Sequence, residues 1–311
     1  MFDIQRYTQT DRQAWNDFVA QSKQGTFLFD RGFMDYHGDR FTDHSLMVYR
    51  KGRLYALLPA NAEGDTLWSH QGLTYGGLLT DRRATVAEVG EVFDAINSAL
   101  RADHFHRVVY KAVPWIYHRI PAEEDLYALV NGCDARIVAR HVSTTLTSSR
   151  LGFEESRKSG LRKAVRAGVE VVESDDYAAF WQILEANLQQ RYGVHPVHTL
   201  EEMRLLKSRF PNVIRLFLAI RGEKTLGGSV VFETPQVVHT QYISASAEGK
   251  ACGALDMLFD HLINHRYAHV PYFDFGKSTN GDGHDLNHSL IFQKEGFGGR
   301  AVCYDWYEYN L

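Results

Sequence analysis

Several features on which other protein classes depend are scarce or absent in this chain of 311 residues. Only three cysteines occur (Cys133, Cys252 and Cys303), with no CxxC spacing, which argues against a disulfide framework and a cysteine zinc site. No apolar run approaches the length of a membrane-spanning helix, and residues 1–11 are polar rather than a secretory signal. We therefore expect a soluble, cytoplasmic protein with no membrane insertion.

The chain also lacks a large excess of charge and a flexible linker. A net charge of −4 gives no general attraction to nucleic acid, so DNA is not expected as a partner. The hydrophobic fraction of 44% and the charged fraction of 23% are those of an ordinary globular protein. A chain of this length exceeds the size at which a single core stops growing, which predicts two domains.

What the sequence does contain is one order of predicted elements that occurs twice. The first copy is expected to have strands at 45–49 and 54–60 around Gly52, a Gly-rich strand at 68–79, a helix at 84–100 and a strand at 105–112. The second is expected to have strands at 213–220 and 225–233 around Gly222, a strand at 237–245, a helix at 253–264 and a strand at 272–275. Further helices are predicted at 11–21, 176–192 and 200–209, and a strand at 141–149. The repeat predicts a duplicated α/β fold with mixed central sheets flanked by helices.

Four segments match a known family: RKSGLRKA at 157–164, HTQY at 239–242, YFDFG at 272–276 and LIFQKEGFG at 290–298. With these motifs the chain resembles the FemAB-like branch of the GNAT acyltransferase superfamily, which includes bacterial peptidoglycan aminoacyltransferases and acetyltransferase-like proteins. The resemblance implies tandem GNAT domains at 1–145 and 146–311, with the acyl donor in the second. The first is expected to have lost the cofactor, because Asp81 rather than a positively charged turn begins its helix.

A Gly-bearing turn between the predicted strand at 237–245 and the next helix is the candidate for phosphate binding. Glycines allow backbone N–H groups to approach a phosphate, and the helix N-terminus favours negative charge. The resemblance implies that the pyrophosphate of acetyl-CoA binds here, although a plain strand-to-helix connection is the alternative. The candidate cofactor-binding residues are Gly249, Lys250, Ala251, Cys252 and Gly253.

The candidate catalytic residues are Lys294, Asp274 and Tyr242. The resemblance places Lys294 at the acyl-transfer lysine of the peptidoglycan enzymes, where it and backbone amides at 243–245 would stabilise an oxyanion. Asp274 ends a strand and is expected to anchor or deprotonate the amine, or else only to cap the following turn. Tyr242 and His239 are candidates for protonating the leaving group, or else belong to the core.

Substrate binding is assigned to Arg157, Arg162, His239 and Lys277. Five cations fall within residues 157–166 of a predicted helix, and arginine side chains four apart would share a face. Such a face suits phosphates or carboxylates, although a solvated surface is the alternative. No metal is expected, because no third ligand accompanies the pair His261 and His265.

The function predicted from the sequence is acetyl transfer from acetyl-CoA to an amine by direct attack. The acceptor is expected to be a small molecule or a cell-envelope precursor. Two alternatives stay open: an aminoacyl-tRNA-dependent aminoacyltransferase acting on peptidoglycan precursors, and a non-catalytic module that binds an anionic cell-wall or polysaccharide precursor.

Overall fold

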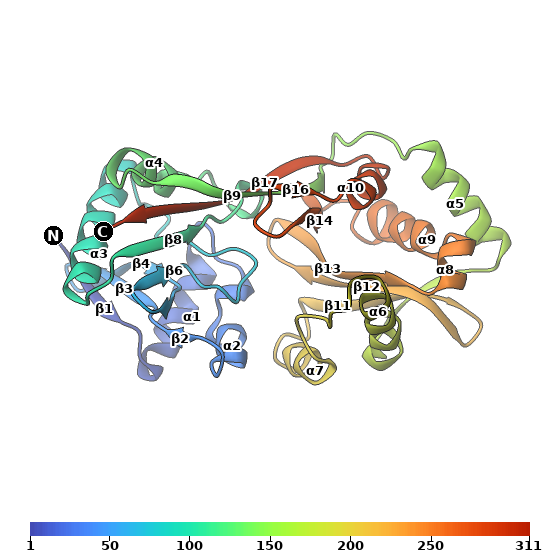
Figure 1. Ribbon diagram of the computed structural model, residues 1–311, viewed down its shortest axis with the longest axis horizontal. Helices are drawn as coiled ribbons and strands as arrows, with labels where there is room; N and C mark the ends of the chain where they lie inside the picture. The colour runs from blue at the N-terminus through green and yellow to red at the C-terminus, as the bar shows by residue number, and fades with distance from the viewer. The chain divides into compact units, whose positions relative to one another are not determined.

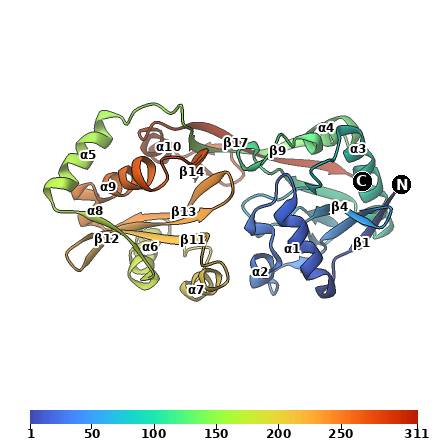
Figure 2. The same ribbon diagram turned by 180° about the vertical axis from the view of Figure 1, so that it is seen from behind.

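The computed structural model describes residues 1–311 apart from the side chain of Tyr192, and the chain divides into two compact units. Unit 1 comprises Met1–Val142, Thr279–Asp285 and Cys303–Leu311, and unit 2 comprises Ser143–Ser278 and Leu286–Val302. The division expected at residue 145 differs from these units, because the C-terminal strand returns to unit 1. Figures 1 and 2 show each unit from opposite sides.

Unit 1 contains two small sheets and four α-helices among its described elements. Its strands are β1 (Phe2–Arg6), β2 (Thr42–Asp43), β3 (Leu46–Arg50), β4 (Arg53–Leu58), β5 (Asn61–Glu63), β6 (Thr66–Trp68), β7 (Leu79–Thr80), β8 (Arg107–Lys111) and the last part of β17 (Arg300–Asn310). Its helices are α1 (Arg12–Gln21), α2 (Arg31–Met34), α3 (Val86–Ala102) and α4 (Glu124–Gly132). One sheet has the order β1-β3-β4-β7, and the strands of the other follow as β17-β8-β6-β5-β2, with β6 and β8 parallel.

The prediction of a Gly-rich strand at 68–79 is wrong. Only its ends are strands, in β6 and β7, and the residues between them form a loop. A Cβ at Gly76 would lie 1.7 Å from the Ser69 carbonyl oxygen, so the chain folds tightly back on itself here. The Lys111 ammonium donates to the carbonyls of His70 and Gln71, both at 3.2 Å, and holds the loop against β8.

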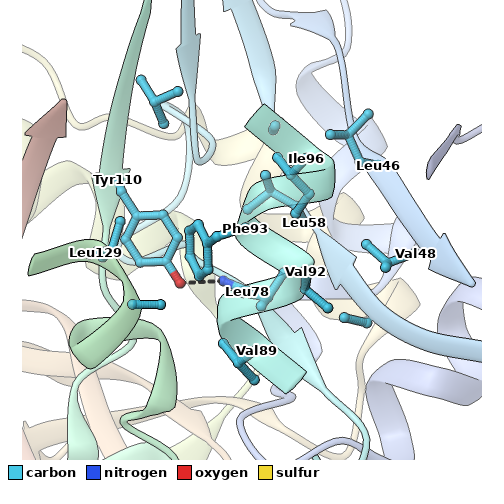
Figure 3. Close-up of a cluster of buried hydrophobic side chains, with 14 of the residues drawn as sticks. Leu46, Val48, Leu58, Leu78, Val89, Val92, Phe93, Ile96, Tyr110 and Leu129 are labelled. Carbon is cyan, nitrogen blue, oxygen red and sulfur yellow. Dashed lines mark hydrogen bonds between the residues drawn. The ribbon is translucent and has the colours of Figure 1, made fainter. Parts of the chain in front are cut away.

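The core of unit 1 lies where α3 packs on the sheets (Figure 3). Val89, Val92 and Phe93 of α3 are buried in it. The Tyr110 hydroxyl accepts a hydrogen bond from the Leu78 N–H at 2.6 Å. It also donates a hydrogen bond to Asp125 at 2.5 Å. Burial raises the pKa of Asp125 to about 6, although this hydrogen bond opposes the shift.

Unit 2 carries one mixed sheet with helices on both faces. Its strands are the end of β9 (Arg136–Leu146), β10 (Glu170–Ser174), β11 (Ile214–Arg221), β12 (Lys224–Glu233), β13 (Val237–Ala245) and β14 (Tyr272–Lys277). Its helices are α5 (Glu155–Arg166), α6 (Tyr177–Tyr192), α7 (Leu200–Arg209), α8 (Ala247–Cys252), α9 (Ala254–Asp260), which continues as a π-helical turn at His261–Arg266, and α10 (His288–Glu295). In Figures 1 and 2, α6 and α7 lie on one side of β11–β13, and α5, α8 and α9 on the other.

Part of the strand order recurs in the two units, as a duplication predicts. Unit 2 runs β10-β11-β12-β13-β14-β9, antiparallel except for the parallel pair of β13 and β14. In unit 1, β1, β3 and β4 correspond to β10, β11 and β12, and the parallel pair β6–β8 again has a helix between its strands. The short strands β15 (Thr279–Asn280) and β16 (Asp285–Leu286) pair with each other. None of the helices in the described residues has the length and apolar character needed to cross a membrane.

Candidate active site

The parallel strands β13 and β14 pair over only three residues and then part. The paired residues are Val237, Val238 and His239 of β13, opposite 272–274 of β14. Further along, β13 carries one extra residue, Gln241, relative to β12, and β14 turns at Gly276, whose φ is +72°. A bulge and a left-handed glycine both redirect a strand. The edge of β13 beyond His239 therefore has no partner strand on the β14 side among the described pairings.

Asp274 lies at the last paired position of β14 and is fully buried. Its carboxylate accepts hydrogen bonds from His239 Nδ1 at 2.7 Å, Thr145 Oγ1 at 2.7 Å, Gly276 N at 3.2 Å and the Ser143 hydroxyl. Burial alone would raise the pKa of Asp274, but the hydrogen bonds and the charge of His239 hold it below its usual value. Asp274 is thus an ionised acceptor with its lone pairs engaged. The carboxylate is therefore poorly placed to take a proton from an amine, which was one of the roles expected for it from the sequence.

The partner of this carboxylate is His239, the residue opposite Asp274 in the parallel pair. The Nδ1–H of the ring donates to Asp274, which fixes the tautomer and makes Nε2 the basic nitrogen. Gly276 packs on the ring, since a Cβ there would lie 3.0 Å from His239 Cε1. A histidine oriented by a buried carboxylate has the arrangement of a general base.

Two lysines lie at the end of β14. Lys294 of α10 is 5% exposed and donates to the carbonyl oxygens of Gly276 at 2.8 Å and Lys277 at 2.9 Å. Burial lowers the pKa of Lys294 to about 8, against the opposing charge of Asp274. Burial also lowers the pKa of Lys277 to about 8. Lys294 therefore fixes the backbone where the strands separate, with two of its three N–H groups.

Tyr242 follows the bulge and packs against α6. Its hydroxyl accepts from the backbone N–H of His198 at 3.1 Å and lies 2.6 Å from His198 Nδ1. Its ring stands edge-on to Trp181 at 5.2 Å. Burial raises the pKa of Tyr242 to about 12, although its hydrogen bonds oppose the shift, so the phenol stays protonated.

The segment proposed to cradle a pyrophosphate is a helix rather than a turn. Residues 247–252 form α8, where Gly249 N donates to the Ser246 cap at 3.1 Å and Lys250 N to Ser246 O at 2.9 Å. Gly253 lies between α8 and α9 with φ +80°, and a Cβ there would lie 2.2 Å from Gly160 O of α5. The glycines serve helix packing, and within this segment Ala251 and Cys252 are helical. The N–H groups of Gly249 and Lys250 are thus already engaged, which contradicts the expected loop.

The Lys250 side chain is the exception in this segment. Its ammonium donates to Asn187 Oδ1 at 2.7 Å, and the Asn187 amide in turn donates to Ser244 Oγ and Ala245 O at 2.8 Å each. This network ties α6 to the end of β13. Because the partner of Lys250 is a neutral amide, its positive charge is not neutralised by that bond.

The two arginines assigned to substrate binding have different surroundings on α5. Arg157 pairs with Asp256 at 3.0 Å, and its guanidinium lies 5.5 Å from the Phe297 ring centre. These contacts give Arg157 a structural role between α5 and α9. Arg162 has a side chain that is 58% exposed and pairs with the exposed Glu155 at 2.5 Å.

Ser143 and Thr145 of β9 also belong to the site, although they were not predicted from the sequence. They are buried, and they flank the carboxylate of Asp274. Their signal was present in the sequence, because hydroxyl residues two apart on a strand face the same side. Among the described residues, no group of three His, Cys, Asp or Glu side chains is arranged to hold a metal.

Comparison with known proteins identifies the family of the segment that contains His239 and Asp274. Residues 154–284 match the family model of the acetyltransferase (GNAT) domain. The chain contains a GNAT acetyltransferase domain. By this family it is an acyltransferase, and His239 and Asp274 both fall within the matched segment. No curated protein sequence matches the chain.

Solved structures extend the likeness to the whole chain. The structure of FemX is similar over 99% of this chain and 97% of its own, with a TM-score of 0.68 and 11% identity. L-PGS from Bacillus licheniformis is similar over 97% and 91%, with a TM-score of 0.60 and 10% identity. A tandem GNAT protein from the clavulanic acid pathway is similar over 100% and 98%, with a TM-score of 0.54 and 14% identity. The chain thus has the tandem GNAT fold.

Proposed function

We propose that the chain transfers an acetyl group from acetyl-CoA to an amine, with His239 as general base and Asp274 as its positioning partner. One observation carries the proposal: a buried histidine–aspartate pair lies where β13 and β14 part, inside the matched acetyltransferase segment. The acceptor is an amine on a small molecule or a cell-envelope precursor. We also propose a cytoplasmic location, which fits three free cysteines.

The chemistry requires no covalent enzyme intermediate. The amine nitrogen bonds to the acetyl carbon, His239 Nε2 takes its proton, and the carbon–sulfur bond then breaks to release the thiolate. The carboxylate of Asp274 stabilises the imidazolium that forms, and the protonated phenol of Tyr242 is the candidate donor to the thiolate. Backbone N–H groups at 243–245, on the edge of β13 that β14 leaves open, are the candidate donors to the oxyanion.

The acyl donor is proposed to bind along the open edge of β13. The unpaired N–H and C=O groups of a strand edge can form hydrogen bonds with an extended chain. Lys250, whose ammonium is held by Asn187 beside the end of β13, is the candidate contact for the pyrophosphate. Lys294 is proposed to act by fixing Gly276 and Lys277, with its third N–H left for the substrate. This revises its predicted role from oxyanion donor alone to positioning as well.

An aminoacyl-tRNA donor is the second candidate, and the surface of α5 favours it. Lys158, Arg162, Lys163 and Arg166 are all exposed on this helix, and the chain has the fold of FemX and L-PGS. A row of cations binds a phosphate backbone without reading its sequence. Arg157 is not available for this purpose, because it pairs with Asp256.

The test is calorimetry and turnover on the same protein. Coenzyme A, acetyl-CoA and charged tRNA are titrated in parallel, and thiol release is followed with a panel of amines. We expect acetyl-CoA to bind and Lys250→Ala to weaken it about 10-fold, the low end for a hydrogen bond to a charged group. Binding of charged tRNA without coenzyme A would replace the first function by the second, and turnover by neither donor would leave a binding module.

A further inference from the structure

A pocket of about 280 Å³ lies on unit 1, away from the residues of the acetyltransferase segment. It lies between the end of α1, the start of β4 and the loop that leads from β7 to α3. Its lining residues are Phe18, Gln21, Ser22, Arg53, Asp81, Arg82 and Arg83. Three arginines and one aspartate give this lining a net charge of +2.

The arginines of the pocket lack a partner that would explain their grouping. Among the residues that the structure describes, the guanidinium groups of Arg53, Arg82 and Arg83 form no ion pair or hydrogen bond with protein. The nearby carboxylate of Asp81 accepts the backbone N–H of Arg83 at 2.7 Å. Three like charges around one hollow repel one another unless an anion joins them.

Attraction to the negative C-terminus of α1 does not account for them either. Three of the last four carbonyls of that helix already have donors. Phe18 O accepts Ser22 N at 2.9 Å, Val19 O accepts Ser22 Oγ at 3.0 Å, and Ala20 O accepts Arg119 Nη1 at 2.5 Å. Arg119 adds a further cation at this end, and its pKa is lowered by burial and by the charge of Arg82.

We propose that this pocket binds a phosphate group, as a phosphate monoester or a diphosphate. A phosphate offers several oxygens in different directions, so it can accept from three guanidinium forks, whereas a single carboxylate offers two in one plane. Its charge of about −2 near neutral pH matches the net charge of the lining. The site does not depend on the proposed acetyl transfer, because none of its residues lies in unit 2.

The test uses the full chain and inorganic pyrophosphate as the probe, by calorimetry at low salt. We expect saturable binding that weakens as salt is added. Arg82→Gln and Arg53→Gln should each weaken binding about 10- to 100-fold, the range for one hydrogen bond to a charged group. Asp81→Asn removes the repelling charge and should strengthen it. Arg136→Gln, an exposed arginine of β9, is the matched control and should change nothing.

Three results would overturn the proposal. Pyrophosphate could fail to bind at millimolar concentration, or it could bind the arginine variants as tightly as the parent. Malonate binding as tightly as pyrophosphate would refute the assignment to phosphate. If pyrophosphate instead binds at the proposed coenzyme A site, Lys250→Ala would weaken its binding and Arg82→Gln would leave it unchanged. Failure of this proposal is therefore distinguishable from failure of the proposed function.

Discussion

Replacing Asp274 by asparagine should remove the charge behind His239 while keeping the shape of the site. Of the four donors around the carboxylate, His239 Nδ1 and Gly276 N are fixed N–H groups, and Ser143 and Thr145 are hydroxyls. Hydroxyls rotate and can accept as well as donate. The asparagine oxygen can therefore face the two N–H groups while its NH₂ faces the hydroxyls, so the histidine keeps its tautomer.

The expected loss of kcat follows from the charge that the Asp274→Asn substitution removes. A carboxylate and an imidazolium about 4 Å apart attract by about 4 kcal/mol at an effective dielectric constant of ~20. Desolvation of the pair offsets part of this attraction. We expect kcat of the Asp274→Asn variant to fall by about 10- to 10³-fold. His239→Gln removes the base itself and should cost about 10²- to 10⁴-fold.

The assay measures kcat and KM from thiol release, with the acceptor found in the amine panel, and the free energy of unfolding from urea titration. Asp274→Asn should leave the affinity for coenzyme A unchanged and lower the free energy of unfolding by no more than about 2 kcal/mol. His265→Gln, at an exposed histidine of the same unit, controls for the substitution itself. Folded Asp274→Asn and His239→Gln proteins with parental kcat would refute the assignment of the base.

Three further predictions concern other residues of both units. Lys294→Met removes the donor to two backbone carbonyls, so we expect kcat to fall about 10²- to 10³-fold, with a smaller loss of stability in the same urea titration; an intact kcat would contradict this. Arg157→Ala leaves the buried Asp256 unpaired and should lower the free energy of unfolding by about 1–3 kcal/mol, whereas the exposed Arg162→Ala should change it by less than about 0.5 kcal/mol; equal effects would refute the contrast. Asp125 has its pKa raised to about 6, so the folded state holds that proton more tightly; its contribution to stability is greatest below pH ~4 and is lost, by up to about 3 kcal/mol, as the pH rises through ~6. Asp125→Asn should flatten this part of the pH dependence measured by urea titration, and an unchanged slope would contradict the assignment.

The sequence predicted the fold because its elements are strongly patterned. The apolar runs of β11 and β12 and the hairpin at Gly222 lie where the sequence pattern placed them, and α7 matches its predicted bounds. The Gly-rich stretch after Trp68 was misread, because the tight approach of Gly76 to Ser69 is a tertiary contact that periodicity does not record. The return of β17 to unit 1 was missed for the same kind of reason, since pairing between distant strands leaves no local pattern.

The site was harder to predict than the fold. Asp274 and His239 were each singled out, but their pairing depends on a parallel register between strands 35 residues apart. Residues 249–252 of the predicted turn are helical, and glycines that permit close packing look the same in sequence as glycines that approach a ligand. Position 253 has no room for a side chain, because α5 approaches it closely at Gly160.

The duplication also gives a physical reason to expect chemistry in one copy only. The parallel pair of unit 1 runs from Thr66 opposite Arg107 to Trp68 opposite Val109, and that of unit 2 ends with His239 opposite Asp274. Trp68 and Val109 therefore occupy, by register, the positions of the base and its partner. Neither side chain can hold or move a proton between them, since indole only donates and valine does neither. Unit 1 thus keeps the parallel pair with an apolar pair of residues at this position, and the fold becomes a candidate catalyst only where a histidine and a carboxylate replace that pair.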